Sequence, residues 1–195
     1  MKSVFITATD TGVGKTIVTA FLAKYMLEKG CNVITQKWVQ TGCSKFSLSD
    51  AAFHLKIMGR DKNDIKGFRD YILPYMFKTP SSPHLASLIE NKKISAARII
   101  KSFKVLSKRF DFVIVEGSGG VLVPYNKKDL MIDIVKKLDL AVLVVAQNKL
   151  GAINHALLSI EALRRRNIEI LGILFNNPQK EDARIIKDNP RIVGA

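Results

Sequence analysis

Residues 3–16 read Ser3-Val-Phe-Ile-Thr-Ala-Thr-Asp-Thr-Gly-Val-Gly-Lys-Thr16, and the rest of the chain is best interpreted outward from them. The apolar run from Val4 to Ile6 is typical of a buried strand. Apolar residues after Thr16 recur at helical spacing, which predicts a helix over about 14–29 that ends at Gly30. A strand, a glycine-bearing turn, Gly-Lys-Thr and a helix together form the layout of a phosphate-binding loop.

Such a loop binds phosphate mainly through its backbone, because N–H groups at a helix start point at the anion and the helix dipole favours it. Lys15 would reach the terminal phosphates, and the Thr16 hydroxyl would ligate a magnesium ion that the phosphates also hold. The residues that we assign to nucleotide binding here are Gly12, Val13, Gly14, Lys15, Thr16 and Ile17.

The loop departs from the usual pattern in one respect. A glycine normally stands five residues before the second loop glycine, and Thr9 stands there instead, preceded by Ala8. The alternative interpretation is an ordinary strand–turn–helix unit with a chance Gly-Lys-Thr.

Composition favours one domain over residues 1–195, since 47% of the residues are hydrophobic and can form a substantial core. No apolar run approaches the ~20 residues of a membrane span, and the N-terminus does not read as a signal peptide. Cys31 and Cys43 are therefore expected to be free thiols in a reducing cytoplasm.

The net charge of +14 is large, but the basic residues are spread along the chain. No basic tail and no aromatic-rich RNA-binding motif accompanies them. We therefore expect small anionic ligands as partners, with neither nucleic acid nor a membrane.

Predicted strands and helices alternate along the whole chain, without repeats or low-complexity linkers. This pattern predicts a doubly wound α/β fold with a mainly parallel sheet and helices on both faces. Beyond the first unit, we expect strands at 33–37, 112–117, 140–146 and 168–175, an extended segment at 71–77, helices at 95–108, 129–138 and 151–166, and the beginning of a strand at 191–195.

Polar residues follow several of these strands, and ligands in parallel α/β sheets sit beyond the carboxyl ends of strands. Lys37 and Thr41 follow the second strand, and Glu116 ends a later one, as the acid of a phosphate-loop site does when it holds magnesium. Ser49 and Asp50 precede a helical pattern, and either residue suits the N-cap.

Several motifs in the same order resemble dethiobiotin synthetases, from residue 1 to about residue 177. They are Thr9-Asp-Thr-Gly-Val-Gly-Lys-Thr16, Lys37 with Thr41-Gly42, Ser81-Ser-Pro-His84, Val115-Glu-Gly-Ser-Gly-Gly120, Lys149-Leu-Gly-Ala-Ile-Asn-His155 and the strand end at Asn176. That family closes a cyclic urea from ATP, carbon dioxide and 7,8-diaminononanoate with magnesium, in biotin biosynthesis.

The resemblance implies a role for each matching position. Catalysis falls to Lys37, Lys15 and Thr11, and magnesium to Thr16, Asp50 and Glu116. Nucleotide contacts extend to Gly117, Ser118, Gly119, Asn176 and Asn177. Thr41 would contact the diamine, and its carboxylate would meet Gly151, Ala152, Ile153 and Asn154 of the other subunit in a homodimer. No histidine or cysteine nucleophile is required.

Two further positions depart from the family. Trp38 stands where the family has proline, and it would either line the diamine pocket or pack on the sheet. The family also continues past 191–195 into a segment with an Ile-Pro pair and adenine contacts. Either that segment is missing from this sequence or the base pocket closes differently, so we expect looser discrimination among ATP, GTP and CTP.

Three alternatives remain open from the sequence. A partition-type ATPase would carry a second lysine five residues before Lys15, where this chain has Asp10. A cobyrinate-type amidation enzyme would need a glutamine-hydrolysing domain, for which 195 residues leave no room. A basic nucleic-acid-binding module rests on the net charge alone.

Overall fold

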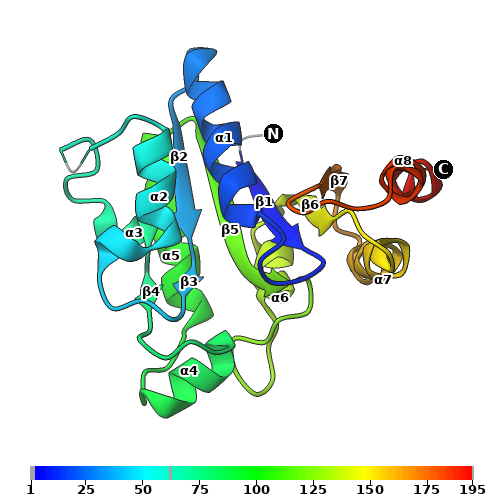
Figure 1. Cartoon of the computed structure of the whole chain (residues 1–195). Helices are drawn as coiled ribbons and strands as arrows, with labels where there is room; N and C mark the ends of the chain where they lie inside the picture. Colours follow the sequence, from blue (N-terminus) through cyan, green and yellow to red (C-terminus); the bar gives the residue numbers. More distant parts are fainter. Residues whose placement is uncertain (1–2, 62, 195) are drawn as a thin grey trace.

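The structure is a computed structural model that describes residues 3–61 and 63–194. At its centre lies a five-stranded parallel sheet with the strand order β2-β5-β1-β6-β7 (Figure 1). The strands are β1 (Ser3–Ala8), β2 (Val33–Lys37), β5 (Phe112–Gly120), β6 (Ala141–Gln147) and β7 (Ile170–Asn176). The predicted α/β fold with a parallel sheet is confirmed.

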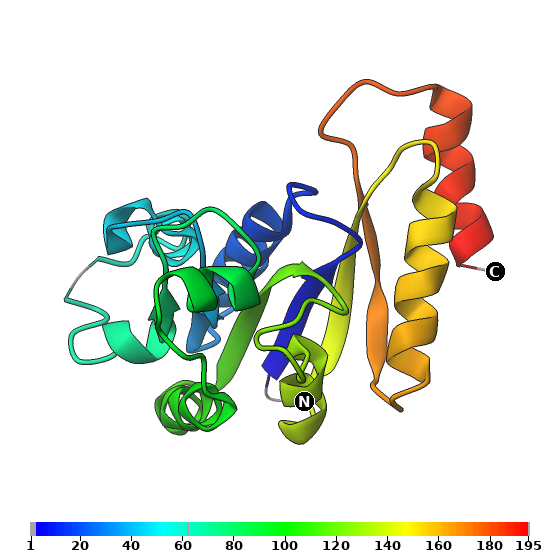
Figure 2. The same ribbon diagram turned by 90° about the horizontal axis from the view of Figure 1, so that it is seen from below.

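Helices lie on both faces of this sheet. They are α1 (Lys15–Glu28), α2 (Asp50–Ile57), α3 (Arg69–Ile72), α4 (Pro83–Ile89), α5 (Ala96–Arg109), α6 (Met131–Lys137), α7 (Ala152–Arg164) and α8 (Ala183–Val193). Helix α1 packs on one face and α5 and α6 on the other, while α7 and α8 stand side by side beyond β7 (Figures 1 and 2). No helix in the described part of the chain is long and apolar enough to cross a bilayer.

Successive side chains of the central strands enter two different cores, as the period of two in a strand requires. Phe5 of β1 joins the larger apolar cluster, with residues of α5 and α6. Its neighbours Val4 and Ile6 join the smaller cluster, with residues of α1. Burial on both faces explains why these strands read as continuous apolar runs in the sequence.

The strand order places the phosphate-binding loop at a reversal of the sheet. From β1 the chain runs to β2 on one side, and after β5 it crosses to β6 on the other side of β1. Ligands in open parallel sheets bind in the crevice at such a point, beyond the carboxyl ends of the strands. The loop at 9–14 lies at this end of β1.

The prediction of a strand at 191–195 is wrong. Residues 183–193 form α8, and Ala195 lies outside the described residues. Ile192 and Val193 have the β-branched side chains that favour strands. Here Asp182 caps a helix instead, since its side chain accepts a hydrogen bond from the Arg184 N–H at 2.8 Å, and α8 packs against α7.

The extended segment predicted at 71–77 is correct only in part. Helix α3 includes residues 71 and 72, and the strand that follows, β4, is Tyr75–Met76 alone. It pairs with β3 (Val39–Gln40), a strand that the sequence analysis did not predict. This pairing is long-range in sequence, so local patterns could not indicate it.

Candidate active site

The turn after β1 has the backbone of a phosphate-binding loop. Gly12 and Gly14 have φ angles of 76° and 105°, in the left-handed region, and Gly14 is the N-cap of α1 without a side-chain cap. A Cβ at Gly14 would also collide with the amide of Asn176. The methyl group of Ala8 is buried in the smaller apolar cluster, so the missing glycine leaves the loop intact.

Lys15 begins α1 and is buried. Its Nζ donates a hydrogen bond to the carbonyl oxygen of Asp10 at 3.1 Å, across the loop. Burial, together with the nearby charge of Lys37, lowers the pKa of Lys15 to about 8. An ammonium that is short of counter-charge is suited to an anionic ligand such as phosphate.

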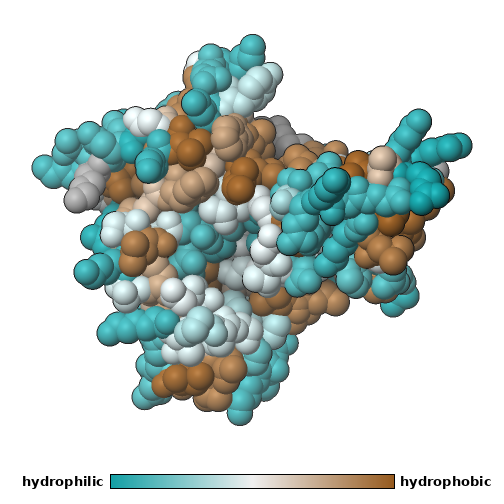
Figure 3. All heavy atoms as spheres, in the orientation of Figure 1, coloured by the Kyte–Doolittle hydropathy of each residue, from teal (hydrophilic) through white to brown (hydrophobic). Residues whose placement is uncertain are grey.

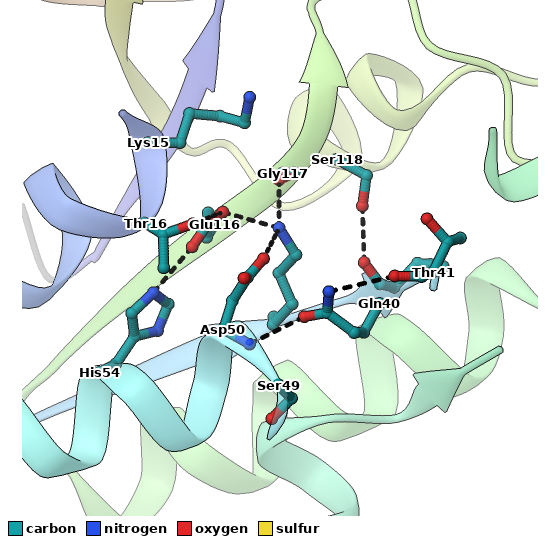
Figure 4. A network of polar contacts seen from close by, with 12 residues as sticks. Lys15, Thr16, Gln40, Thr41, Ser49, Asp50, His54, Glu116, Gly117 and Ser118 are labelled. Carbon is teal, nitrogen blue, oxygen red and sulfur yellow. Dashed lines mark hydrogen bonds and ion pairs between the residues drawn. The ribbon is translucent and has the colours of Figure 1, made fainter. Parts of the chain in front are cut away.

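Lys37 and Glu116 are neighbours because the sheet pairs them. Lys37 ends β2, and its register partner on β5 is Glu116, so both side chains leave the same edge of the sheet. The Nζ of Lys37 lies 2.7 Å from Oε1 of Glu116, 2.8 Å from Oδ2 of Asp50 and 3.0 Å from the carbonyl oxygen of Gly117 (Figure 4). One buried ammonium thus joins carboxylates from two different elements.

The charges in this cluster stabilise one another. Burial alone would lower the pKa of Lys37, but Glu116 and Asp50 outweigh burial and raise it. For Glu116, burial is opposed by Lys37 and by a contact with His54, which lower the pKa of its carboxyl to about 2. Both groups are therefore charged at neutral pH.

The residues predicted to hold magnesium converge in the same place. The Thr16 hydroxyl donates to Oε1 of Glu116 at 3.1 Å, and Lys37 links this carboxylate to Asp50. Within the described residues, no three His, Cys, Asp or Glu side chains form a metal-binding group. Two carboxylates and one hydroxyl nevertheless fit Mg²⁺, which uses few protein oxygens and takes its other ligands from phosphate and water.

Asp50 owes its position to two neighbours. Ser49 is the N-cap of α2, since its Oγ accepts a hydrogen bond from the N–H of Ala52 at 3.2 Å. This settles which of the two candidates caps the helix and leaves the Asp50 carboxylate for other partners. The N–H of Asp50 donates to Oε1 of Gln40 at 2.9 Å, a contact that the sequence did not indicate.

Lys15, Lys37, Asp50 and Glu116 line a single cavity of about 680 Å³. Figure 4 shows part of it. Of the predicted site residues, the cavity includes Thr11, Gly12, Gly14, Lys15, Thr16, Ile17, Lys37, Thr41, Asp50, Glu116, Ser118 and Gly119. In Figure 3, which keeps the orientation of Figure 1, the middle of the face is pale, as expected for glycine, serine and threonine.

The cavity also contains residues that the sequence analysis left without a role. They are Val39, Gln40, Pro80, Ser81, Ser82, Pro83 and Val123. The Ser81-Ser-Pro-His84 motif was recognised as part of the resemblance, and its place at the start of α4 explains its presence here. Val39 and Gln40 carried no motif, because short β3 brings them to the site through its long-range pairing with β4.

Four predicted nucleotide contacts lie outside the cavity lining. The carbonyl oxygen of Gly117 accepts a hydrogen bond from Nζ of Lys37 at 3.0 Å. Val13 is buried in the smaller apolar cluster. The Nδ2 of Asn176 donates to the carbonyl oxygen of Val13 at 2.9 Å, so this residue touches the loop from the end of β7. Asn177 follows Asn176 and is exposed.

The predicted contacts to the diamine carboxylate lie in a different place. Leu150, Gly151 and Ile153 line a second cavity of about 570 Å³, which is completed by residues of α8. Gly151 has φ of 86° and begins α7. Within one chain, therefore, the cavity that includes Thr41 does not include the start of α7.

Trp38 packs on the sheet and does not line the active-site cavity. It is 1% exposed, its ring centroid is 5.0 Å from that of Phe5, and its Nε1 donates to Oε1 of Gln36 at 2.9 Å. The structure thus decides between the two roles that the sequence left open for this residue.

The comparisons with known proteins agree with the motifs. A family model described as an AAA domain matches residues 2–194. The chain is 42% identical over 188 residues to ATP-dependent dethiobiotin synthetase BioD 2 of Haemophilus influenzae, covering 95% of this chain and 96% of the relative. It is 41% identical over 192 residues to ATP-dependent dethiobiotin synthetase BioD of Chlorobaculum tepidum, covering 97% of this chain and 79% of the relative.

Solved structures resemble the chain in fold. A ParA family ATPase from Chlorobium tepidum matches with a TM-score of 0.58 at 16% identity, over 100% of this chain and 82% of that one. The pNOB8 ParA bound to nonspecific DNA matches with a TM-score of 0.59 at 15% identity, over 99% of this chain and 74% of that one. At such identities, only the fold is shared.

Proposed function

Because the chain belongs to the family of ATP-dependent dethiobiotin synthetases, as its similarity to those relatives establishes, we propose that it forms the cyclic urea of dethiobiotin from ATP, carbon dioxide and 7,8-diaminononanoate. The observation that carries the proposal is the cluster in which Lys37 lies between Asp50 and Glu116, in one cavity with Lys15 and Thr41. This places two cations and a hydroxyl beside the phosphate-binding loop.

In the first part of the reaction, a negatively charged carbamate must approach the negatively charged γ-phosphate of ATP. One amine of the diamine adds to carbon dioxide and loses a proton, which forms a carbamate. A carbamate oxygen then attacks the γ-phosphorus of ATP, the bond to the bridging oxygen breaks, and ADP leaves with a carbamic–phosphoric anhydride formed. Lys15 and Lys37 reduce the repulsion and stabilise the charge on the transferring phosphoryl group.

The second part of the reaction is ring closure. The other amine attacks the anhydride carbon, a C–N bond forms and the C–O bond to phosphate breaks. The attacking nitrogen loses a proton, and phosphate leaves. This step depends mainly on holding the amine beside the carbonyl, so no side-chain nucleophile is needed. Thr41 follows β3 and Thr11 lies in the loop, and both line the cavity. Thr41 would orient the diamine, and Thr11 would contact the phosphates.

Magnesium would be held by Thr16, Asp50 and Glu116, and when bound it would neutralise charge on the phosphate oxygens. Lys37 shares the two carboxylates with that site. The Lys37 ammonium and the metal would therefore contact the same two carboxylates. Lys37 would also interact with the negative charge of the carbamate and of the γ-phosphate.

The nucleotide half of the proposal is tested by phosphate release. The protein, MgATP, bicarbonate and diaminononanoate are mixed, and release is expected only when the diamine is present. Lys15→Ala should lower the rate by at least about 100-fold, because it removes a cation from the transferring phosphoryl group. Lys24→Ala, on the exposed side of the same helix, is the matched control and should leave the rate unchanged.

Other outcomes of this assay would reject the proposal. Phosphate release that ignores the diamine, or that rises with DNA, would favour a partition-type ATPase. An undiminished rate in Lys15→Ala would remove the phosphate-binding loop from the mechanism. DNA binding that depends on salt, without any ATP turnover, would favour a nucleic-acid-binding module.

A further inference from the structure

A buried histidine touches the active-site carboxylate from the side opposite the cavity. His54 is completely buried on α2, one helical turn after Asp50, so both side chains lie on the same face of the helix. Its Nε2 lies 2.7 Å from Oε2 of Glu116 (Figure 4). Helix α2 therefore carries one carboxylate of the site and also contacts the other.

The two oxygens of Glu116 face different surroundings. Oε1 receives the Lys37 ammonium at 2.7 Å and the Thr16 hydroxyl at 3.1 Å, on the cavity side. Oε2 has the His54 contact on the interior side. Glu116 is 1% exposed, so water cannot replace His54 at Oε2 without entering the core.

The chemistry of the contact requires a proton between the two atoms. A lone pair on Nε2 at 2.7 Å from a carboxylate oxygen would be repelled, so Nε2 must carry hydrogen. The contact is short but does not have hydrogen-bond geometry: within the described residues, Nδ1 and Nε2 of His54 and Oε2 of Glu116 all lack a hydrogen-bond partner, although Nε2 and Oε2 lie 2.7 Å apart. Glu116 is thus the one short polar contact of this imidazole that the described residues provide.

We propose that His54 is a positioning residue that holds the Glu116 carboxylate through Oε2 and so fixes Oε1 toward Thr16, Lys37 and the magnesium site. This inference rests on the proposed function, because it gives the histidine a purpose only if Glu116 helps to bind metal with ATP. The N–H of His54 is the polar group that faces Oε2 at 2.7 Å, although the two atoms do not meet with hydrogen-bond geometry. Without it, the buried negative charge on Oε2 would lose this contact, and the carboxylate would turn toward the Lys37 ammonium. Oxygen ligands are then no longer aimed at the metal.

The expected effect falls on metal dependence more than on folding. Groups that orient a metal ligand typically change metal affinity or activity by about 10–100-fold when they are removed. His54→Leu should therefore raise the Mg²⁺ concentration at which ATP binding is half-maximal by at least about tenfold. Binding of ATP without metal, measured in EDTA, should stay at the wild-type level, because the loop and Lys15 are untouched.

The experiment compares variants by the fluorescence of a mant-labelled ATP titrated with Mg²⁺. His54→Gln places an amide N–H near the position of Nε2 and should restore the metal dependence to within about threefold of wild type. His54→Asn places its N–H near Nδ1 and should behave as His54→Leu does, and it replaces that variant if the leucine does not fold. Leu55→Ala, buried beside it on α2, is the control for lost stability alone.

The possible results distinguish a failure of the proposed role of His54 from a failure of the proposed magnesium site. If His54→Leu, or His54→Asn in its place, shows only the lower Tm of Leu55→Ala and keeps the wild-type Mg²⁺ dependence, His54 is a core residue and the inference is wrong. If Gln fails to restore what Asn and Leu lose, the N–H contact with Oε2 is not the cause, and the inference again fails. If the wild type itself binds the probe equally with and without Mg²⁺, the proposed metal site is what fails.

Discussion

Lys37 shows how little of a side chain's role its own position in the sequence reveals. Its place at a strand end indicated a rim residue, but its partners come from β5 and from α2, 79 and 13 residues away in sequence. The sheet register that sets Lys37 opposite Glu116 makes the first contact unavoidable. The second depends on the start of α2, which Ser49 and Gln40 hold in place.

The pKa of Lys15 predicts how ATP binding depends on pH. The charged form binds phosphate, and burial together with Lys37 lowers this pKa to about 8 in the protein without ATP. Affinity should therefore be full below pH 8 and weaken as the pH rises through 8, by up to about tenfold per unit. Calorimetric titration with ATP between pH 7 and pH 9.5 measures this.

Lys37→Met provides a direct check on that explanation. Removing the Lys37 charge raises the pKa of Lys15, so the loss of affinity should begin at higher pH than in the wild type. A wild-type protein whose affinity is constant up to pH 9.5 would contradict the prediction, and so would an unchanged profile in the variant.

Gly14, at the start of α1, is constrained both by its backbone angle and by a neighbouring side chain. Gly14 has φ of 105°, and a Cβ there would meet the amide of Asn176, which donates to the carbonyl oxygen of Val13. The amide of Asn176 can move, but the backbone angle cannot be adopted easily by any other residue. The conformation of the phosphate-binding loop and the start of α1 therefore both depend on Gly14.

Gly14→Ala should weaken ATP binding by at least about tenfold, because the strained residue displaces the N–H groups that surround phosphate. Gly30→Ala is the matched control. Gly30 also has positive φ, 82°, but a Cβ would meet nothing within 4 Å, and it lies at the other end of α1. That control should lower stability by about 1 kcal/mol and leave ATP affinity unchanged, as measured by urea unfolding and calorimetry. Equal ATP affinities in both variants would contradict the prediction.

Helix α8 is attached to the segment that leads into α7. The Nδ2 of buried Asn189 donates to Oδ1 of Asn148 at 2.7 Å and to the carbonyl oxygen of Lys149 at 3.0 Å. In return, Nδ2 of Asn148 donates to the carbonyl oxygen of Ile186 at 2.9 Å. Because both asparagines are buried, these hydrogen bonds stabilise the start of α7. The helix α8 takes the place of the strand that the local sequence suggested.

Across the molecule, the predicted site residues form two groups. Lys15, Lys37 and Thr41 share one cavity, while Gly151 and Ile153 line another with α8. We propose that the site is shared between subunits, with the start of α7 from one copy completing the cavity of the other, and this separation within one chain supports the proposal. A helix N-terminus suits the carboxylate of the diamine.

Mixing subunits tests the shared site. Lys15→Ala should remove ATP use, and Gly151→Val, which strains the start of α7, should remove diamine binding while keeping ATP binding. Equal amounts of the two, unfolded and refolded together, should recover about a quarter of wild-type activity, because half the dimers are mixed and each has one intact site. Refolding each variant alone should recover none. A mixture that stays inactive, although it forms dimers on a sizing column, would show that each site lies within one chain.

The local parts of this protein follow from its sequence because short-range chemistry dictates them. The strand at Val4 to Ile6, the glycine-bearing turn before Lys15 and the alternation of strands and helices were all predictable, and the candidate phosphate-binding residues from Gly12 to Thr16 followed from the same local pattern. Lys37 and Glu116 were also predictable, since parallel strands bring their carboxyl ends to one edge.

What folding alone decided are the contacts that join distant segments. These include Trp38 packing on Phe5, the pairing of β3 with β4, α8 in place of a strand, and His54 against Glu116. A solitary histidine on an apolar helix carries no spacing signal, and a β-branched C-terminal segment is ambiguous without its neighbours. The energy of each contact depends on a partner that the local sequence does not contain. These contacts therefore could not be predicted without knowing which residues are buried and how the strands are paired.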